Sequence, residues 1–184
     1  GAISGSGAVT KSGSNALVLT GTTSYSGATT ISGGSLTIRN DAPTSSTSTF
    51  AGTGTLAIEP SSTSFTSTFS TSTFPFGTQL TGLTLGKSGN TANVTVASTA
   101  NINGSVTIYG GTVALNSAVT ATSSTLSITA ATAVTQSAAI SSSGLALLGA
   151  GSTTLTNTSN AITTIAAGSS SSRVGALTYV DTNG

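Results

Sequence analysis

The 184-residue sequence contains no cysteine, histidine, methionine or tryptophan. The absence of cysteine excludes a disulfide framework and a thiolate metal site. Without histidine, a serine nucleophile would need a lysine as its base. Such a pair cannot be singled out in a chain of which roughly 40% is Ser or Thr. We therefore expect no enzymatic activity, no catalytic residue, no cofactor and no metal site.

Charged residues are scarce, at 4% of the chain, whereas an ordinary domain has about 25%. The net charge is +1, and the basic residues are scattered at Lys11, Arg39, Lys87 and Arg173. Binding to nucleic acid needs clustered basic residues, and a membrane helix needs about 20 consecutive apolar residues. The longest apolar stretch, "GLALLGAG" at 144–151, is much shorter. We expect neither a nucleic-acid partner nor insertion of this segment into a membrane.

The residues that are abundant favour β-structure. Thr, Val and Ile suit a pleated, half-buried surface, and the 23 glycines suit tight corners. Disordered chains usually carry high net charge and few β-branched residues, which this chain does not. The composition therefore predicts an all-β protein.

A short signature recurs along the chain, in which a small residue precedes two β-formers separated by a small residue. It starts at Gly34 and Gly54, and again at Gly104, Ser124 and Gly144. Within each of these two groups, successive starts lie about 20 residues apart. Its apolar residues alternate, so they share one face of a strand. This repeat length favours the coils of a parallel β-solenoid over a hairpin sandwich, which would show turn signals every 8–12 residues.

The alternation predicts which residues fill the interior of the solenoid and which glycines form its corners. The predicted core consists of Leu17, Leu19, Ile31, Leu36, Ile38, Leu56, Ile58, Val106, Ile108, Leu126, Ile128, Leu145 and Leu147. The predicted turn glycines are Gly5, Gly7, Gly13, Gly27, Gly33, Gly34, Gly110 and Gly111.

Residues 42–79 depart from this pattern. They are rich in Ser and Thr and contain all five phenylalanines and all three prolines. We expect an irregular excursion whose phenylalanines cover one rung or a seam of the solenoid; a flexible linker is the alternative. The chain thus reads as one solenoid segment, 1–184, divided into 1–41, 42–79 and 80–184, and we expect it to be part of a longer protein.

Residues 3–38 resemble the autotransporter-associated β-strand repeat. The matching sequence is "ISGSGAVTKSGSNALVLTGTTSYSGATTISGGSLTI". The positions that carry the resemblance are Gly5, Gly7, Val9, Lys11, Gly13, Leu17, Leu19, Gly21, Tyr25, Ser26, Gly27, Thr29, Ile31, Gly33, Gly34 and Leu36. Residues 133–184, with "VTQSAAI", "LTNTSNAITTIAA" and "GALTYVDTNG", are similar to repeats of filamentous-haemagglutinin-like exoproteins.

These resemblances imply a right-handed parallel β-helix on the outer surface of a Gram-negative bacterium, or released from it. They imply adhesion, aggregation or biofilm formation, with host-surface or glycan ligands as partners. Open sheet edges and near-zero charge also favour self-association, so a self-assembling filament subunit is an alternative. Outward threonines leave open a less favoured role in binding ice or crystalline carbohydrate.

Two further sequence patterns bear on possible catalytic or phosphate-binding chemistry. Asp41 and Glu59 lie about one repeat apart, near Arg39, and such groups form the grooves of some β-helical polysaccharide lyases. The simpler interpretation is that "RNDAP" at 39–43 is a turn with its arginine paired or solvated. "TGLTLGKS" at 81–88 lacks the first glycine of a phosphate loop and precedes a predicted strand, so it predicts no phosphate site.

Overall fold

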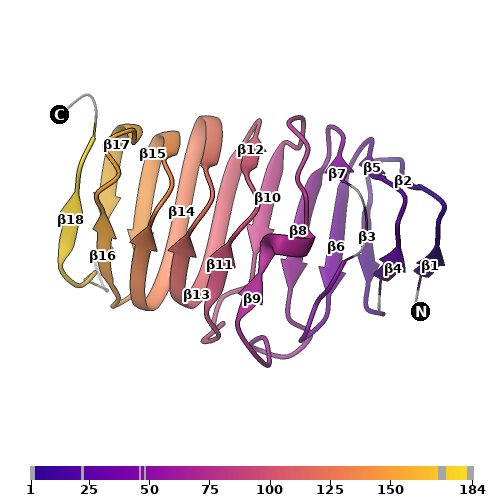
Figure 1. Cartoon of the computed structure of the whole chain (residues 1–184), viewed down its shortest axis with the longest axis horizontal. Helices are drawn as coiled ribbons and strands as arrows, with labels where there is room; N and C mark the ends of the chain where they lie inside the picture. Colours follow the sequence, from indigo (N-terminus) through magenta and orange to yellow (C-terminus); the bar gives the residue numbers. More distant parts are fainter. Residues whose placement is uncertain (1–2, 22, 46, 48, 170–172, 182–184) are drawn as a thin grey trace.

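The chain folds into a β-solenoid. The computed structural model describes residues 3–21, 23–45, 47, 49–169 and 173–181. Parallel strands wind through about nine turns, with equivalent residues roughly 20 positions apart. The coils stack side by side into a rod, with the two termini at opposite ends (Figure 1). The predicted all-β class and the parallel solenoid are confirmed.

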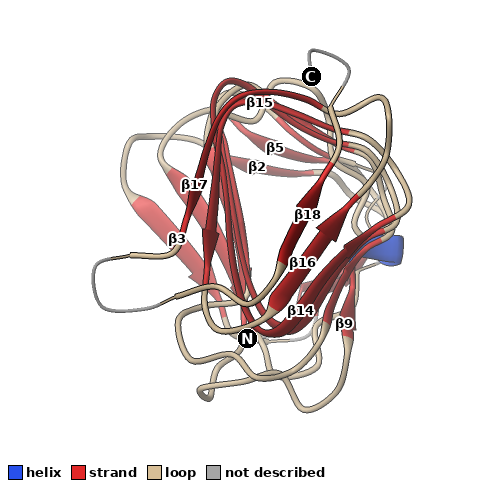
Figure 2. Cartoon of the chain, turned by 90° about the vertical axis from the view of Figure 1, so that its left-hand side faces the viewer, coloured by secondary structure: helices blue, strands red, loops and turns tan. Residues whose placement is uncertain are grey.

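Each complete coil contributes three strand segments in turn, and Figure 2 shows the resulting roughly triangular cross-section. We call the three walls face A, face B and face C, in chain order within a coil. Face A holds β1 (Ile3–Gly5), β4 (Thr23–Tyr25), β9 (Phe69–Ser70), β11 (Val94–Val96), β16 (Ser152–Leu155) and β18 (Leu177–Tyr179). Face B holds β2 (Val9–Lys11), β5 (Thr29–Ile31), β7 (Phe50–Ala51) and β12 (Ala100–Ile102). Face C holds β3 (Ala16–Leu19), β6 (Ser35–Arg39), β8 (Thr55–Glu59) and β10 (Gly82–Leu85).

Four long strands bend around corners and so belong to more than one face. They are β13 (Ser105–Leu115), β14 (Val119–Gln136), β15 (Ile140–Leu148) and β17 (Ala161–Ala167). In β14, for example, the first residues pair with β12 on face B and the middle residues pair with β13 on face C. The later coils are therefore more continuous than the earlier ones, whose strands are short and separated by turns.

Face C shows most clearly how the sequence builds the interior. Two inward columns run along it, each with one residue per coil. One column contains Leu17, Leu36, Leu56, Leu83, Val106, Leu126, Leu145 and Ile165. The other contains Leu19, Ile38, Ile58, Leu85, Ile108, Ile128, Leu147 and Ala167. Full burial of one such aliphatic side chain contributes about 1.5–3 kcal/mol, so these columns are a principal source of stability.

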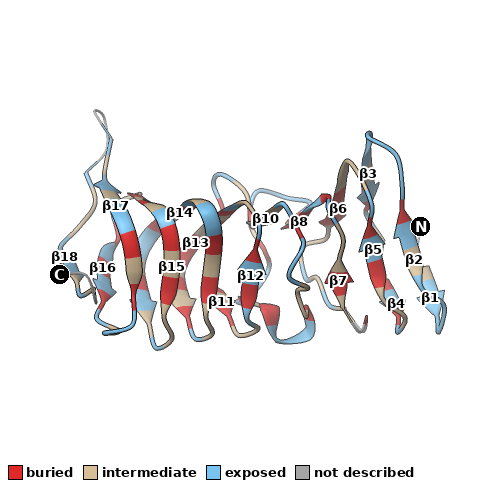
Figure 3. Cartoon of the chain, turned by 90° about the horizontal axis from the view of Figure 1, so that it is seen from above, coloured by how far each residue is buried: buried red, intermediate tan, exposed pale blue. Residues whose placement is uncertain are grey.

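The structure places twelve of the thirteen predicted core residues in the buried core. Buried and less buried residues alternate along the strands (Figure 3). Leu17 is the exception, because it is only partly buried. Its strand, β3, pairs with β6 and forms the edge of the sheet among the described residues, so one side of Leu17 is not covered by another coil.

The predicted turn glycines fall into two groups. Gly5 ends β1, and Gly7, Gly13, Gly27, Gly33 and Gly34 lie between strands. Gly34 has φ +64°, and a Cβ there would lie 2.4 Å from the Asn15 carbonyl oxygen, so both its conformation and its neighbours require glycine. Gly110 and Gly111 instead lie inside β13, where the register shifts between Gly110 and Thr112. The prediction of a turn is wrong there, because a β-bulge carries the strand around the corner without ending it.

The middle segment, 42–79, is partly regular. It contains the regular strands β7 and β8. The irregular part follows β8, and it lengthens the coil so that Thr55 pairs with Gly82, 27 residues later. This part contains β9 and the single described 3-10 turn, η1 (Thr71–Thr73). Phe65, Phe69 and Phe74 are buried, and the ring centroids of Phe65 and Phe69 lie 4.9 Å apart. The expectation that the phenylalanines pack against the solenoid is confirmed.

Candidate functional site

Four of the seven charged residues gather at one corner of the rod, where face C leads into face A. Their sequence positions span three successive coils, and the stacking of these coils brings them to the same corner. Arg39 ends β6 and Glu59 ends β8, and these two residues are direct neighbours in the sheet. The Arg39 Nε donates a 2.7 Å hydrogen bond to Glu59 Oε1, and a second guanidinium nitrogen contacts the same oxygen. The other two residues, Asp41 and Lys87, lie in the turns that follow.

Asp41 is fixed by the next coil rather than by a cation. Its Oδ1 accepts hydrogen bonds from the backbone nitrogen of Ser62, at 2.7 Å, and from the Ser62 hydroxyl, at 2.9 Å. These two bonds are the main reason why the pKa of Asp41 is lowered, and the positive charge of Lys87 also contributes. Asp41 and Glu59 therefore have different partners, Ser62 and Arg39. The turn interpretation of "RNDAP", with a paired arginine, is the one observed.

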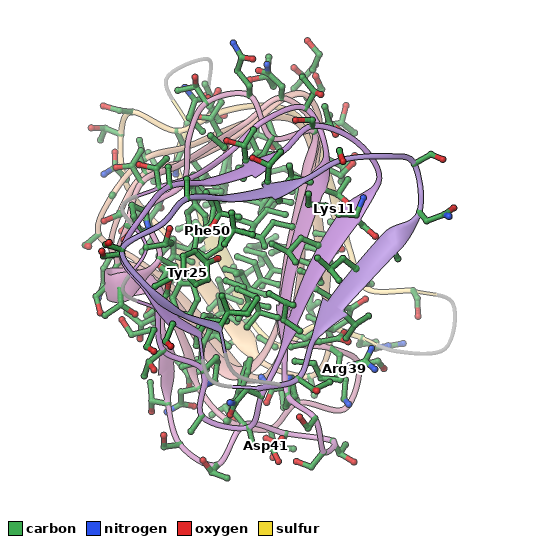
Figure 4. All side chains as sticks on the ribbon, turned by 90° about the vertical axis from the view of Figure 1, so that its right-hand side faces the viewer. Lys11, Tyr25, Arg39, Asp41 and Phe50 are labelled. Atoms are coloured by element: carbon green, nitrogen blue, oxygen red, sulfur yellow. The ribbon has the colours of Figure 1, made fainter. Side chains whose placement is uncertain are left out.

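A groove lies beside Asp41, between the turn at 41–44 and the excursion at 65–73. We call it the Asp41 groove; its volume is about 240 Å³. Its lining residues include Asp41, Pro43, Phe65, Thr68, Phe69 and Ser70. It thus combines one fixed negative charge, several hydroxyls and apolar residues. In Figure 4, which looks along the rod from its N-terminal end, Asp41 and Arg39 lie on the outside, whereas Tyr25 and Phe50 lie in the interior.

The outer surface of face C is flat, small and uncharged over most of its length. Its central outward column consists of Val18, Thr37, Ala57, Thr84, Thr107, Ser127, Ala146 and Ala166. Hydroxyls and methyl groups alternate irregularly along it. This is the surface that a partner approaching the side of face C would meet first.

Lys11 has a role that sequence reasoning missed. It occupies an inward position on face B and is 7% exposed. Its ammonium nitrogen donates to the carbonyl oxygens of Ser12, at 3.0 Å, Gly13, at 2.8 Å, and Gly33, at 2.9 Å. The Gly33 carbonyl belongs to the next coil, so Lys11 joins two successive corners. The paired position in the next coil is Ile31, so no repeated lysine indicated this role in the sequence.

Polar side chains also join coils at the corner between faces A and B. Asn160 is fully buried, and its Oδ1 accepts a 3.1 Å hydrogen bond from the backbone nitrogen of Ile140. One coil later, Asp181 Oδ2 accepts from the backbone nitrogen of Ile162 in the same manner, at 3.0 Å, and from the phenol of Tyr179. Burial and this contact with Asp181 raise the pKa of Tyr179 above its ordinary value. These groups are structural, because each is engaged within the fold.

No group of three or more His, Cys, Asp and Glu side chains that could hold a metal ion occurs among the described residues. Within that same part of the chain, no helix is long and apolar enough to span a membrane.

A comparison with protein families matches residues 9–38 to the passenger-associated-transport-repeat. This is a repeat of autotransporter passengers, so the resemblance of the N-terminal residues is confirmed. Such a repeat indicates a secreted or surface location. No curated protein and no solved structure matches the chain. The similarity of residues 133–184 to haemagglutinin-like exoproteins stays a prediction.

Proposed function

We propose that this chain, which carries an autotransporter passenger repeat, is a non-enzymatic structural segment of a surface or secreted protein of a Gram-negative bacterium. Its role is adhesion, aggregation or the scaffolding of a biofilm. The observation that carries the proposal is the uncharged, hydroxyl-rich wall of a solenoid that also contains the passenger repeat. A rod of this kind extends away from a cell and presents a long side surface.

Low charge is the physical basis for adhesion by this wall. Like charges keep proteins apart in solution, and only seven charged residues occur in the chain, four of them at one corner. Apart from the Arg39–Glu59 pair, the paired outward positions of face C are uncharged, with residues such as Thr84, Thr107 and Ala146. Close contact with a neutral surface therefore costs little desolvation of ions.

The test is an adhesion assay with beads that carry the purified chain. Coated beads should aggregate and attach to epithelial cells or to a polysaccharide film, whereas albumin-coated beads should not. The matched control is the triple variant Thr37→Lys, Thr84→Lys and Thr107→Lys, which charges the outward column of face C without touching the core. It should reduce attachment at least fivefold at low salt. Equal attachment by albumin beads, or full attachment by the triple variant, would count against the proposal.

A second candidate function is that of a filament subunit. The exposure of a core position in the last described coil favours it. Leu177 occupies the inward column that contains Val113, Val134 and Thr153, yet it is 40% exposed. A sheet edge that presents an exposed apolar residue at a core position is a template for another strand. Negative-stain electron microscopy over a range of concentrations tests this function. Filaments as wide as one rod would support it, and separate short rods at every concentration would contradict it.

A further inference from the structure

The Asp41 groove is the place where the solenoid departs most from its repeat. The residues paired across successive coils are 20 apart at Ser35 and Thr55, but 27 apart at Thr55 and Gly82. The additional residues form the loop after β8, together with β9 and η1, and they build one wall of the groove. The excursion therefore adds a concave site beside the corner where face C leads into face A.

The carboxylate of Asp41 is held in a fixed orientation by hydrogen bonds from Ser62. Both hydrogen bonds from Ser62 go to Oδ1. The carboxylate lies at the surface, so its oxygens retain acceptor sites that a ligand can use. Because the bonds from Ser62 lower the pKa of Asp41, the group remains a charged acceptor at any ordinary pH. A charged acceptor forms stronger hydrogen bonds with hydroxyls than a neutral one does.

The remainder of the groove supplies the two other properties that a sugar ring needs. Thr68, Ser70 and Thr73 contribute hydroxyls that can donate and accept. Ala42 and Pro43 contribute apolar lining for the C–H face of a pyranose, whereas Phe65 and Phe69 are buried in the core. The volume of about 240 Å³ is smaller than the pockets of about 300–1,000 Å³ that hold drug-sized ligands, which suits one ring rather than several.

The charges around the groove favour a neutral ligand. Arg39 and Glu59 neutralise each other through their ion pair, and the positive charge of Lys87 acts on Asp41. The corner therefore has no net charge to attract a cationic side chain over a long distance. A calcium ion would require six to eight oxygen ligands, including several carboxylates, whereas the groove has only one carboxylate.

We propose that the Asp41 groove binds a single neutral sugar residue, with the carboxylate of Asp41 accepting hydrogen bonds from its hydroxyls. This inference rests on the proposed adhesive function and assigns it a ligand class and a site. A one-ring ligand in a shallow groove should bind weakly, with a dissociation constant on the order of 1 mM.

The test is a titration of the ¹⁵N-labelled chain, followed by NMR, with the methyl glycosides of glucose, galactose, mannose and N-acetylglucosamine. At least one should shift the amide signals of residues 41–44 and 62–73 selectively. Asp41→Asn should weaken that binding at least tenfold. Glu59→Gln, the same chemical change outside the groove, should alter it less than twofold. The dispersion of the amide signals shows in the same experiment whether each variant is folded.

Three results would overturn the sugar site: no selective shift with any glycoside, equal binding by folded Asp41→Asn protein, or shifts at the groove caused only by N-acetyl-lysine amide. The last result would assign the groove to a cationic peptide side chain instead. The bead assay keeps the two proposals distinguishable. If Asp41→Asn beads attach as well as the parent beads while the triple lysine variant does not, adhesion by face C stands and the groove is not its basis.

Discussion

At the scale of one residue, Lys11 shows how a buried charged side chain joins neighbouring coils. Three backbone carbonyls surround its ammonium group, and one of them belongs to the neighbouring coil. Lys11→Met would preserve much of the aliphatic stem but leave these carbonyls without their donor. Leaving buried acceptors without partners costs about 1–3 kcal/mol, so we expect a clearly lower urea midpoint, measured by circular dichroism.

Lys87→Met is the matched control for this prediction. The Lys87 ammonium makes one exposed hydrogen bond, at 3.3 Å, to the Ser61 carbonyl. Its loss should shift the midpoint very little, because exposed polar contacts contribute little to stability. Equal shifts for both variants would mean that Lys11 does not join the two corners.

Asp41 makes the stability of the chain sensitive to acid. Its pKa is lower in the folded state than in the unfolded chain, mainly because of the two hydrogen bonds from Ser62. The resulting stabilisation is present above the unfolded pKa and is lost as the pH falls through the folded pKa. We therefore expect the urea midpoint to fall as the pH drops below about 4. Asp41→Asn should have a smaller drop than the parent chain; an identical drop in the variant would assign the acid sensitivity to other groups.

The sequence predicts some of these residues much better than others. Twelve predicted core residues are buried because alternation along a strand fixes which side chains point inward. The partners of Lys11 and Asp41 could not be predicted in the same way. Gly33 lies 22 residues from Lys11 and Ser62 lies 21 from Asp41, so each contact depends on how neighbouring coils align.

At the scale of secondary-structure elements, the repeat signature predicts strands well and corners less well. "GSVTI" and "GTVAL", at 104–108 and 111–115, look like two strands separated by a Gly-Gly turn. They are two parts of the continuous strand β13, because a bulge bends the sheet without interrupting its pairing. Short-range patterns do not distinguish a turn from a bulge at a glycine pair, since both need a residue with little steric bulk.

The irregular excursion depends on its aromatic packing. Phe74 is fully buried, with its ring centroid 5.9 Å from that of Phe50 and 5.5 Å from that of Phe69. Phe74→Ala should lower the free energy of unfolding by about 3–5 kcal/mol, because it removes a large buried ring and leaves a cavity. Phe76→Ala, at a half-buried position in the same segment, should cost markedly less. Similar losses measured by urea denaturation would show that the excursion is held by other contacts.

At the scale of the whole molecule, the rod has a long side surface with few charges and a last described coil in which one core position is partly exposed. The side surface is uncharged along most of face C, and one end exposes an inward column at Leu177. If coils of separate copies stack on this end, a charge at Leu177 would have to be buried in the new interface. Burial of an unpaired charge is strongly unfavourable, so Leu177→Lys should prevent end-to-end association while leaving the coils before it intact.

Sedimentation velocity measures this effect at concentrations where the parent chain associates. We expect Leu177→Lys to sediment as single rods. Thr107→Lys, which places the same charge on face C, should continue to form end-to-end assemblies, because its strand, β13, lies away from both ends of the rod (Figure 1). Loss of association in both variants would mean that total charge, and not the open end, controls assembly. Association of Leu177→Lys at the parent level would mean that the copies meet through their sides, which would unite aggregation and adhesion on the same uncharged wall.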